Sequence, residues 1–335
     1  MLAELAFSTS DLAQLRFAVS PMWEVGPSFR LLASGAARPA RPVHPVHRPW
    51  IEQVRPRVAD AGLDRGWLAE LIPPSGYVPD FLNPAPAGPA PTLARELAGI
   101  LAAPDDRVRR DLDRLGHEQG GLGPRSRSLY AEPKTRRERL VEEIETYWEL
   151  ALAPYWARIR GVLDADVFLR ARQVAEQGPG RLFNALHPSL SWDDDALLLG
   201  NRQRALSRKA AGAGLVLIPS VFTGPVPFTR VSPPEPPQLA YPARGTGALW
   251  QPRSAPRAEA LAAVLGRSRT RLLTELDTPA STTVLARRTG LSPSGVSQYL
   301  TALRDAGLVS AHRAGRSVLY ARTSVAEALL AGVPA

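Results

Sequence analysis

The chain has 335 residues, 44% of them hydrophobic, which is enough for two or three globular domains with ordinary cores. Its net charge of +9 favours a polyanionic partner, and the absence of cysteine excludes disulfides, thiolate metal sites and cysteine nucleophiles. No stretch approaches the roughly 20 consecutive apolar residues that a membrane helix needs, so no membrane partner is expected.

Residues 1–180 are predicted to be mainly helical, after a short strand at 2–7. Apolar residues at helical spacing indicate helices at 8–19, 20–35, 50–71, 92–115 with a break at Pro104, 133–153 and 155–177. The pattern at 133–153 is the strongest of these, because apolar side chains such as Leu140 and Ile144 recur every three or four residues among charged ones. We expect this region to form a sensor or dimerisation domain.

Residues 181–250 differ in character from the helical region before them. Short apolar runs at 181–192, 214–223 and 237–250 are bounded by glycine and proline, as is typical of strands and turns. We therefore expect a small β-rich segment that packs with the helical domain.

Residues 257–335 are predicted to form a third domain. The expected elements are helices at 258–265 and 268–277, a helix from Ser281 to a turn at Gly290, a helix opened by Ser292 and Pro293, and strands at 308–312 and 317–322. Helix, tight turn, helix and hairpin is the order of a winged helix-turn-helix. The fold class expected for the whole chain is α+β, mostly helical, ending in this domain.

The second helix of the turn has the spacing of a recognition helix. Val296, Leu300 and Leu303 share its inward face, which leaves polar side chains outward near its first half. Among these, the Gln298 amide can bond adenine bidentately. The residues predicted to bind DNA are Ser292, Ser294, Ser297, Gln298, Tyr299, Thr301, Arg304, Arg313 and Arg316.

The two wing arginines, Arg313 and Arg316, are expected at the tip of the hairpin, where they can reach phosphate or the minor groove. Charge supports this assignment, since 257–335 carries ten arginines and five acidic residues, more than half of the net charge of the chain. Each outward polar residue alone is more often a solvated helix position. It is the order of the elements that favours double-stranded DNA as the partner.

Four segments of this domain resemble an ArsR-type repressor domain. They are LARRTGLS at 285–292, VSQYL at 296–300, LRDAGLV at 303–309 and GRSVLY at 315–320. The resemblance implies a homodimeric transcriptional regulator that usually represses and whose release from DNA is set by a ligand or a metal. The chain departs from the metal-sensing members because it has no cysteine, so the expected effector is a small molecule rather than a thiolate-bound metal.

The N-terminal part is similar to a domain of unknown function that accompanies such winged helices in actinobacterial regulators. The segments that carry this similarity are residues 7–8, 11–13, 16–18, 20–24, 217–222 and 241–245. The similarity brings no activity with it. It is compatible with a domain that dimerises or that senses an unidentified ligand.

Other chemistry has weaker support in the sequence. His44 and His47 lie among prolines, and His187 with the acidic run 193–195 is better explained by a turn than by a metal or hydrolytic site. No phosphate-binding glycine loop or serine nucleophile elbow is present. We therefore expect no enzyme activity, no cofactor and no metal.

The N-terminus shows no charged leader followed by an apolar run, which predicts a cytoplasmic protein. The seven tryptophans are expected to be core residues, although some could line an effector pocket. The alternative to a DNA-binding regulator is an assembly module whose winged helix has lost DNA contact.

Overall fold

A computed structural model gives the fold. It describes residues 3–33, 45–193, 196–200, 207–208, 214–251, 255, 257–315 and 317–331. The chain divides into two compact units. The first comprises Met1–His44, Arg65–Glu142 and Val162–Thr246, and the second Pro45–Asp64, Glu143–Gly161 and Gly247–Ala335. The α+β, mostly helical class predicted from the sequence is confirmed.

The first unit combines helices with two small sheets. Its helices are α1 (Thr9–Ala13), α2 (Met22–Ala33), α4 (Trp67–Leu71), α5 (Leu93–Leu101), α6 (Asp105–Gln119) and α7 (Pro124–Ala131), with parts of α8 (Pro133–Ala151) and α9 (Trp156–Leu186). Its strands are β1 (Ala3–Ala6), β2 (Leu15–Phe17), β3 (Leu190–Asp193), β4 (Ala196–Leu199), β5 (Ser207–Arg208), β6 (Leu215–Ser220), β7 (Phe228–Arg230) and β8 (Gln238–Pro242).

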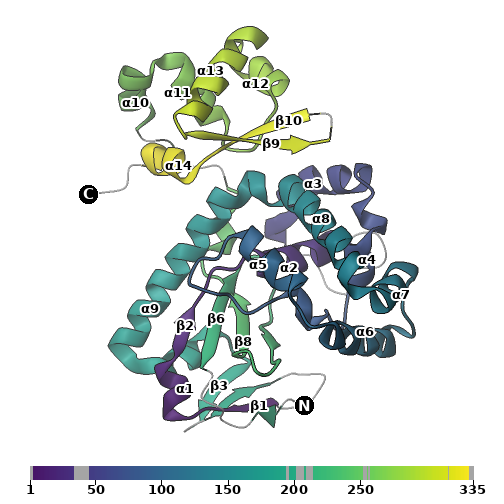
Figure 1. Ribbon diagram of the computed structural model, residues 1–335. Coiled ribbons are helices and arrows are strands. Elements are labelled where there is room, and N and C mark those ends of the chain that lie inside the picture. The colour runs from purple at the N-terminus through teal and green to yellow at the C-terminus, as the bar shows by residue number, and fades with distance from the viewer. Residues whose placement is uncertain are drawn as a thin grey trace. The chain divides into compact units, whose positions relative to one another are not determined.

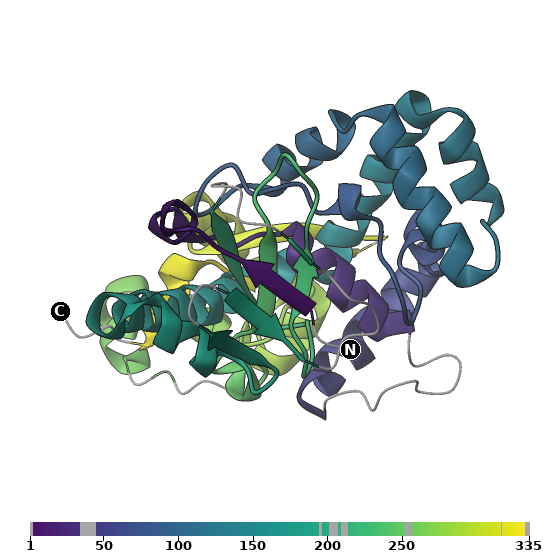
Figure 2. The same cartoon turned by 90° about the horizontal axis from the view of Figure 1, so that it is seen from below.

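The strands form two four-stranded sheets, in the orders β3-β4-β1-β5 and β2-β6-β8-β7. In the second sheet β2, β6 and β8 are parallel, and all six residues of β6 are buried. A continuous apolar strand is expected there, because helices cover a parallel sheet on both faces. Figures 1 and 2 show this arrangement, with α9 on one side of the sheet and α2 on the other.

The structure corrects two sequence predictions in this unit. The helix expected at 8–19 ends at Ala13, and Leu15–Phe17 form strand β2, which pairs with the sequence-distant strand β6. The strand expected from residue 181 is instead the end of α9, kinked at Gly178, whose Leu182 and Phe183 side chains are buried in the sheet core. In both places tertiary packing overrides the local pattern.

The two sheets therefore draw strands from both ends of the region 1–250. Strands β1 and β2 come from the N-terminus and the others from residues 190–242. The predicted boundary between a helical domain at 1–180 and a β-rich segment at 181–250 stays a prediction.

The second unit joins the C-terminal domain to three helical segments. These are α3 (Arg48–Asp60), the end of α8, and the short helix η4 (Ala153–Tyr155) with the start of α9. The C-terminal domain contains α10 (Ala258–Leu265), α11 (Arg267–Glu275), α12 (Thr282–Thr289), α13 (Pro293–Asp305), β9 (Val309–Ala314), β10 (Ser317–Arg322) and α14 (Ser324–Ala331). Helices α10 to α13, the hairpin and α14 surround one apolar core, which is a winged helix.

An aromatic cluster lies in the helical part of this unit. The Trp250 ring stacks on Trp50 at 6.4 Å and meets Tyr155 edge-on at 5.5 Å, and its Nε1 donates to His47 Nδ1 over 3.1 Å. Trp50 is completely buried and donates from Nε1 to the Ala151 carbonyl. Trp50 is a core residue, as the sequence predicts, whereas Trp250 is half-buried, and together they hold three segments of chain.

Candidate nucleic-acid interface

The turn between α12 and α13 follows from four residues. Ser281 caps α12 by accepting from the Val284 amide, and Gly290 ends the helix at φ 69°, a conformation that glycine adopts without strain. Ser292 then caps α13 by accepting from the Gly295 amide at 3.1 Å, with Pro293 as the first helical residue. The helix-turn-helix is therefore specified locally by its caps.

Burial fixes the orientation of α13 within the domain. Val296, Leu300 and Leu303 are buried against Leu285 of α12, as the spacing predicts. Leu291 packs partly buried into the turn between the two helices. Since one face of α13 is held in the core, the opposite face is exposed.

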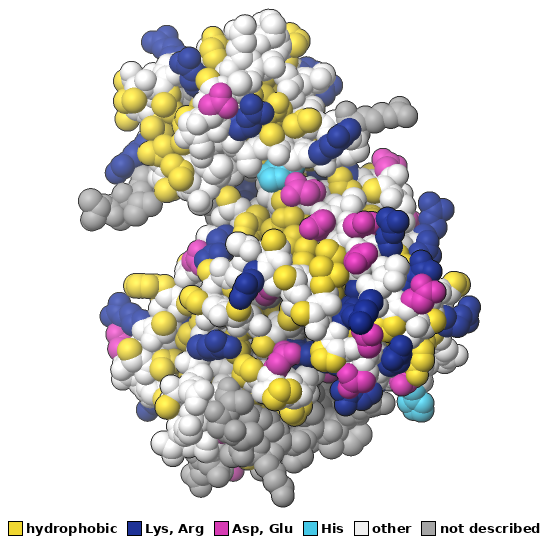
Figure 3. Space-filling view, viewed as in Figure 1, with side chains coloured by type: hydrophobic (Ala, Val, Ile, Leu, Met, Phe, Trp, Pro, Cys, Tyr) yellow, Lys and Arg dark blue, Asp and Glu magenta, His cyan; other side chains and the backbone are white. Residues whose placement is uncertain are grey.

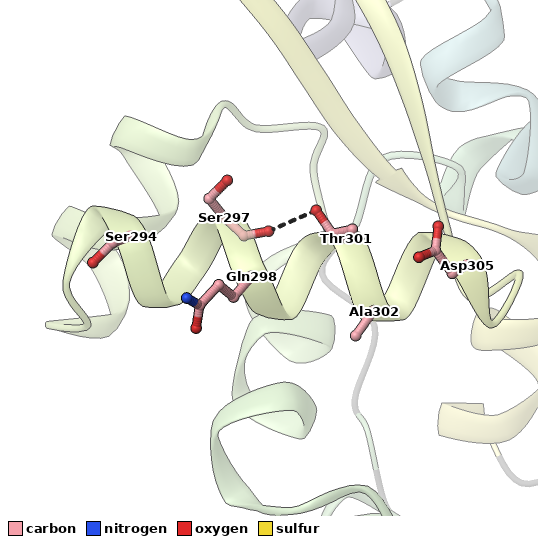
Figure 4. A pocket seen from close by; sticks show the side chains of 6 residues that line it. All are labelled: Ser294, Ser297, Gln298, Thr301, Ala302 and Asp305. Atoms are coloured by element: carbon pink, nitrogen blue, oxygen red, sulfur yellow. Dashed lines mark hydrogen bonds between the residues drawn. The ribbon is translucent and has the colours of Figure 1, made fainter.

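The exposed face of α13 forms a shallow open groove. Its lining residues are Ser294, Ser297, Gln298, Thr301, Ala302 and Asp305 (Figure 4). Four of the six were predicted from sequence, whereas Ala302 and Asp305 were not, because an alanine or an acidic residue gives no signal for DNA contact. The Thr301 hydroxyl donates to the Ser297 carbonyl at 3.0 Å, and the Gln298 amide extends away from the helix.

The other predicted residues of α13 lie beside this groove. Ser292 is exposed but its side chain caps the helix, and Tyr299 is half-buried. Arg304 is half-exposed, with a guanidinium nitrogen 3.6 Å from the Asp305 carboxylate. Ser292 and Arg304 are therefore at the two ends of the helix, and Tyr299 flanks the groove.

Arg269 was missed by the sequence analysis. Its guanidinium lies 5.4 Å from the centre of the Tyr299 ring and donates to the Leu265 carbonyl. The contact joins α11 to the flank of the recognition helix and places a cation there. Helical spacing within α11 shows only that Arg269 is outward, so the contact becomes visible only in the folded domain.

The wing is a two-stranded antiparallel hairpin of β9 and β10. Arg313 pairs with Val318 and Ala314 with Ser317, and Gly315 has φ 59°. Strand β9 therefore extends two residues further than predicted, and Arg313 is an exposed strand residue beside the tip rather than part of the turn. The short turn with glycine at positive φ is a common hairpin solution. Arg316 lies outside the described residues.

The inner side of the wing contacts a helical segment of the same unit. His312 Nδ1 is 3.1 Å from the Glu149 carboxylate of α8, and His312 Nε2 is 2.8 Å from Ser310 Oγ. The wing is thus held from one side, while Arg313, its neighbour in β9, is exposed to solvent.

Asp277, between α11 and α12, joins two buried arginines. Its carboxylate is 2.8 Å from Arg322 of β10 and 3.5 Å from Arg158 of α9, and its carbonyl accepts from Arg158 at 3.1 Å. Arg158 also donates to the Gln251 carbonyl, and Arg322 donates to the Leu276 carbonyl. This charge cluster anchors the winged helix to the segment around residue 158.

Metal ligation is the second kind of chemistry to consider for this chain. Among the described residues, no three His, Cys, Asp or Glu side chains come close enough to hold a metal ion. The two ring nitrogens of His187 are taken up by Ser189 Oγ at 2.8 Å and the Pro225 carbonyl at 2.7 Å. His44, Asp194 and Asp195 of the sequence candidates lie outside the described residues.

Burial raises the pKa of Glu24, Asp80, Glu96 and Asp111 in the first unit. Burial raises the pKa of Glu24 to about 8 and that of Glu96 to about 7, although both accept hydrogen bonds. Glu24 accepts from the Val221 amide, and Glu96 accepts from Ser20 Oγ and the Met22 amide. Their partners are backbone and serine groups of strand ends and helix starts, so we assign them a structural role.

Cationic side chains are dispersed on the visible face of the winged helix. In Figure 3 the visible surface around α12 and α13 is mostly white and yellow, and dark-blue side chains lie singly among them. On the face drawn in Figure 3, the winged helix shows no continuous basic patch.

Comparison with known proteins agrees with this geometry. Residues 270–311 match the family model described as bacterial regulatory protein, arsR family. The chain carries an ArsR-family helix-turn-helix domain. The match runs from α11 through α12 and α13 into β9, and it confirms the resemblance read from the sequence. Domains of this family bind DNA, so the chain is a DNA-binding regulator.

The ArsR-family match covers only the C-terminal part of the chain. No curated protein and no solved structure matches the sequence. No helix in the described ranges is both long and apolar enough to cross a membrane.

Proposed function

We propose that the chain is a sequence-specific transcriptional repressor that binds DNA as a homodimer. The observation that carries this proposal is the exposed groove of α13, which lies in an ArsR-family domain and is lined by side chains able to contact base edges. The groove is uncovered by the rest of its unit, so α13 can enter the major groove of DNA in the described conformation.

Two helices support the dimer. In α10 and α14 the inner residues pack on the core, whereas Val264 is 82% exposed, Val325 55% and Leu329 40%. Exposed large apolar residues on neighbouring helices are a common feature of protein interfaces. We assign this face to a second copy of the chain, because two-fold symmetry would present two α13 helices to half-sites about one helical turn apart.

Residues 1–250 are proposed to sense an effector and to bias DNA binding. The support is the size of this region and its connection to the winged helix through Arg158 and Asp277, which both lie in the second unit. The absence of cysteine directs this proposal to a small molecule rather than a thiolate-bound metal. A mass spectrum of compounds retained by the native protein is the measurement that would identify it.

The DNA-binding part of the proposal is tested by gel shift and fluorescence anisotropy on the DNA upstream of the protein's own gene. We expect specific, salt-sensitive binding by the full chain. Gln298→Ala should reduce discrimination between sequences, whereas Arg313→Ala should weaken all sequences alike and reduce the salt dependence by about one phosphate contact. If the chain is an assembly module without DNA contact, the DNA will not shift in the gel. Neither variant would then differ from the unaltered chain in DNA binding.

A further inference from the structure

The residues that line the groove of α13 fall into two rows. Ser294, Gln298 and Ala302 are four residues apart and form one row, and Ser297, Thr301 and Asp305 form the other. Residues four apart lie on the same side of a helix, about 6 Å from each other along its axis. Figure 4 shows Gln298 and Ala302 projecting from the same side. We call Ser294, Gln298 and Ala302 the reading row.

The second row is less suited to base contact. The Thr301 hydroxyl is already engaged as a donor to the Ser297 carbonyl, and Asp305 brings a carboxylate to the end of the row. DNA phosphates repel a carboxylate. At a base edge, a carboxylate is suited to accept from the cytosine amine. The reading row has no such charge. Within it, only Ser294 has a side-chain partner among the described residues, Ser292 Oγ at 3.3 Å, which favours this row as the one that faces the bases.

We infer that the reading row recognises A·T base pairs, with Gln298 bonding to an adenine and the Ala302 methyl contacting the methyl of a nearby thymine. This inference rests on the proposed DNA-binding function and deepens it by naming the bases. Asparagine and glutamine amides match adenine N6 and N7, and alanine is among the side chains that contact the thymine methyl.

The state of the Gln298 amide supports this role. Gln298 is exposed, and its amide makes no hydrogen bond with any residue that the structure describes. Both amide atoms are therefore available to a base. The helical rise between Gln298 and Ala302 spans one or two base-pair steps, so the adenine and the thymine belong to neighbouring or next-neighbouring pairs.

Guanine recognition is disfavoured by where the nearby cations lie. Guanine O6 and N7 are read most often by arginine or lysine. The single cation of α13, Arg304, is outside both rows and next to Asp305. Arg269 lies over the Tyr299 ring, and Arg288 donates to the Glu275 carbonyl. None of these three arginines lines the groove, so the side chains beside Gln298 are not the ones that usually read guanine.

The first experiment selects preferred duplexes from a random pool with the full-length chain. We expect half-sites that contain an adenine and, one or two steps away, a thymine. Selection with Gln298→Arg should move the preferred base at the adenine position to guanine. Half-sites centred on G·C pairs that are the same for both proteins would overturn the base assignment and leave the regulator intact. No enrichment by either protein would instead contradict the proposed DNA-binding function.

The second experiment changes single atoms of the selected duplex. Replacing the adenine by 7-deazaadenine removes N7 and should weaken binding about tenfold or more, and this penalty should disappear in Gln298→Ala. Replacing the thymine by uracil removes only the methyl and should weaken binding about fourfold. Thr301→Ala, from the other row, is the matched control and should keep both penalties. A 7-deazaadenine penalty that persists in Gln298→Ala would overturn the inference.

Discussion

Gly290 is the residue at which the chain turns from α12 to α13. It has φ 69°, and no atom lies within 4 Å of where a Cβ would be, so any substitution cost there comes from the backbone alone. We predict that Gly290→Ala lowers the opening free energy of α12 and α13 by about 1 to 2 kcal/mol. Gly290→Asn should lose less, because asparagine tolerates this conformation. Amide hydrogen exchange of peptides from both helices measures the effect, and equal losses for Ala and Asn would contradict it.

Glu24 determines a pH dependence of the first unit. Its pKa is raised from 4.5 to about 8, so the folded unit binds a proton that the unfolded chain releases above pH 4.5. The stabilisation from this group is complete below pH 4.5 and is lost as the pH rises to about 8. We predict that Glu24→Gln, which mimics the neutral acid, flattens the fall in stability over this window.

Calorimetric unfolding at pH 5, 6.5 and 8 measures this slope. Glu52→Gln, at an exposed position, controls for the loss of one carboxylate and should keep the slope of the unaltered chain. If Glu24→Gln and the unaltered chain lost stability equally between pH 5 and 8, Glu24 would not be the group responsible.

Among helices and strands, the sequence best predicts those whose ends are determined by residues close by in the chain. The start and end of α12 and α13 follow from Ser281, Gly290 and Ser292, each of which acts on residues within one helical turn. Strand β2 was missed because its partner β6 is distant in the sequence, and no local pattern encodes that pairing. The same reason applies to the site: the groove residues of α13 were largely predictable, whereas the contact of Arg269 with Tyr299 was not.

The cluster around Asp277 is the element-scale link between the winged helix and the segment that carries Arg158. Arg158 and Arg322 are both buried, so removing the shared carboxylate weakens the charge pairing of both guanidinium groups, although Glu327 remains 3.6 Å from Arg322. We predict that Asp277→Asn destabilises the winged helix by about 3 kcal/mol. Asp305→Asn, at an exposed carboxylate, should change the stability by less than about 0.5 kcal/mol.

A double-mutant cycle shows whether Asp277 acts through Arg158. Arg158→Met retains the volume of the side chain and removes its charge. If the ion pair is the link, the cycle should give a coupling of about 1 kcal/mol or more between Asp277→Asn and Arg158→Met. Additive losses in thermal unfolding would show that the two residues stabilise the unit independently.

For the whole molecule, the net charge does not locate the basic surface. Arg137, Arg158, Arg170, Arg230 and Arg322 are buried beside carboxylates, so these pairs offer no cation to DNA and contribute little to the net charge of +9. The net charge therefore indicates a polyanionic partner. It does not predict that the cations lie singly on the visible face of the winged helix. Two linked copies that bind two half-sites together gain overall affinity, which ties DNA recognition to the proposed dimer.

The face of α10 and α14 is where this dependence can be tested. Val264 is 82% exposed, so Val264→Asp should leave the folded chain stable while placing a charge in the proposed interface. We predict that the variant is monomeric at micromolar concentration by light scattering and binds an operator with two half-sites at least tenfold more weakly. Phe168→Asp changes an equally apolar residue of α9, 68% exposed, and should remain dimeric. A dimer in Val264→Asp with unchanged operator affinity would place the interface elsewhere on the chain.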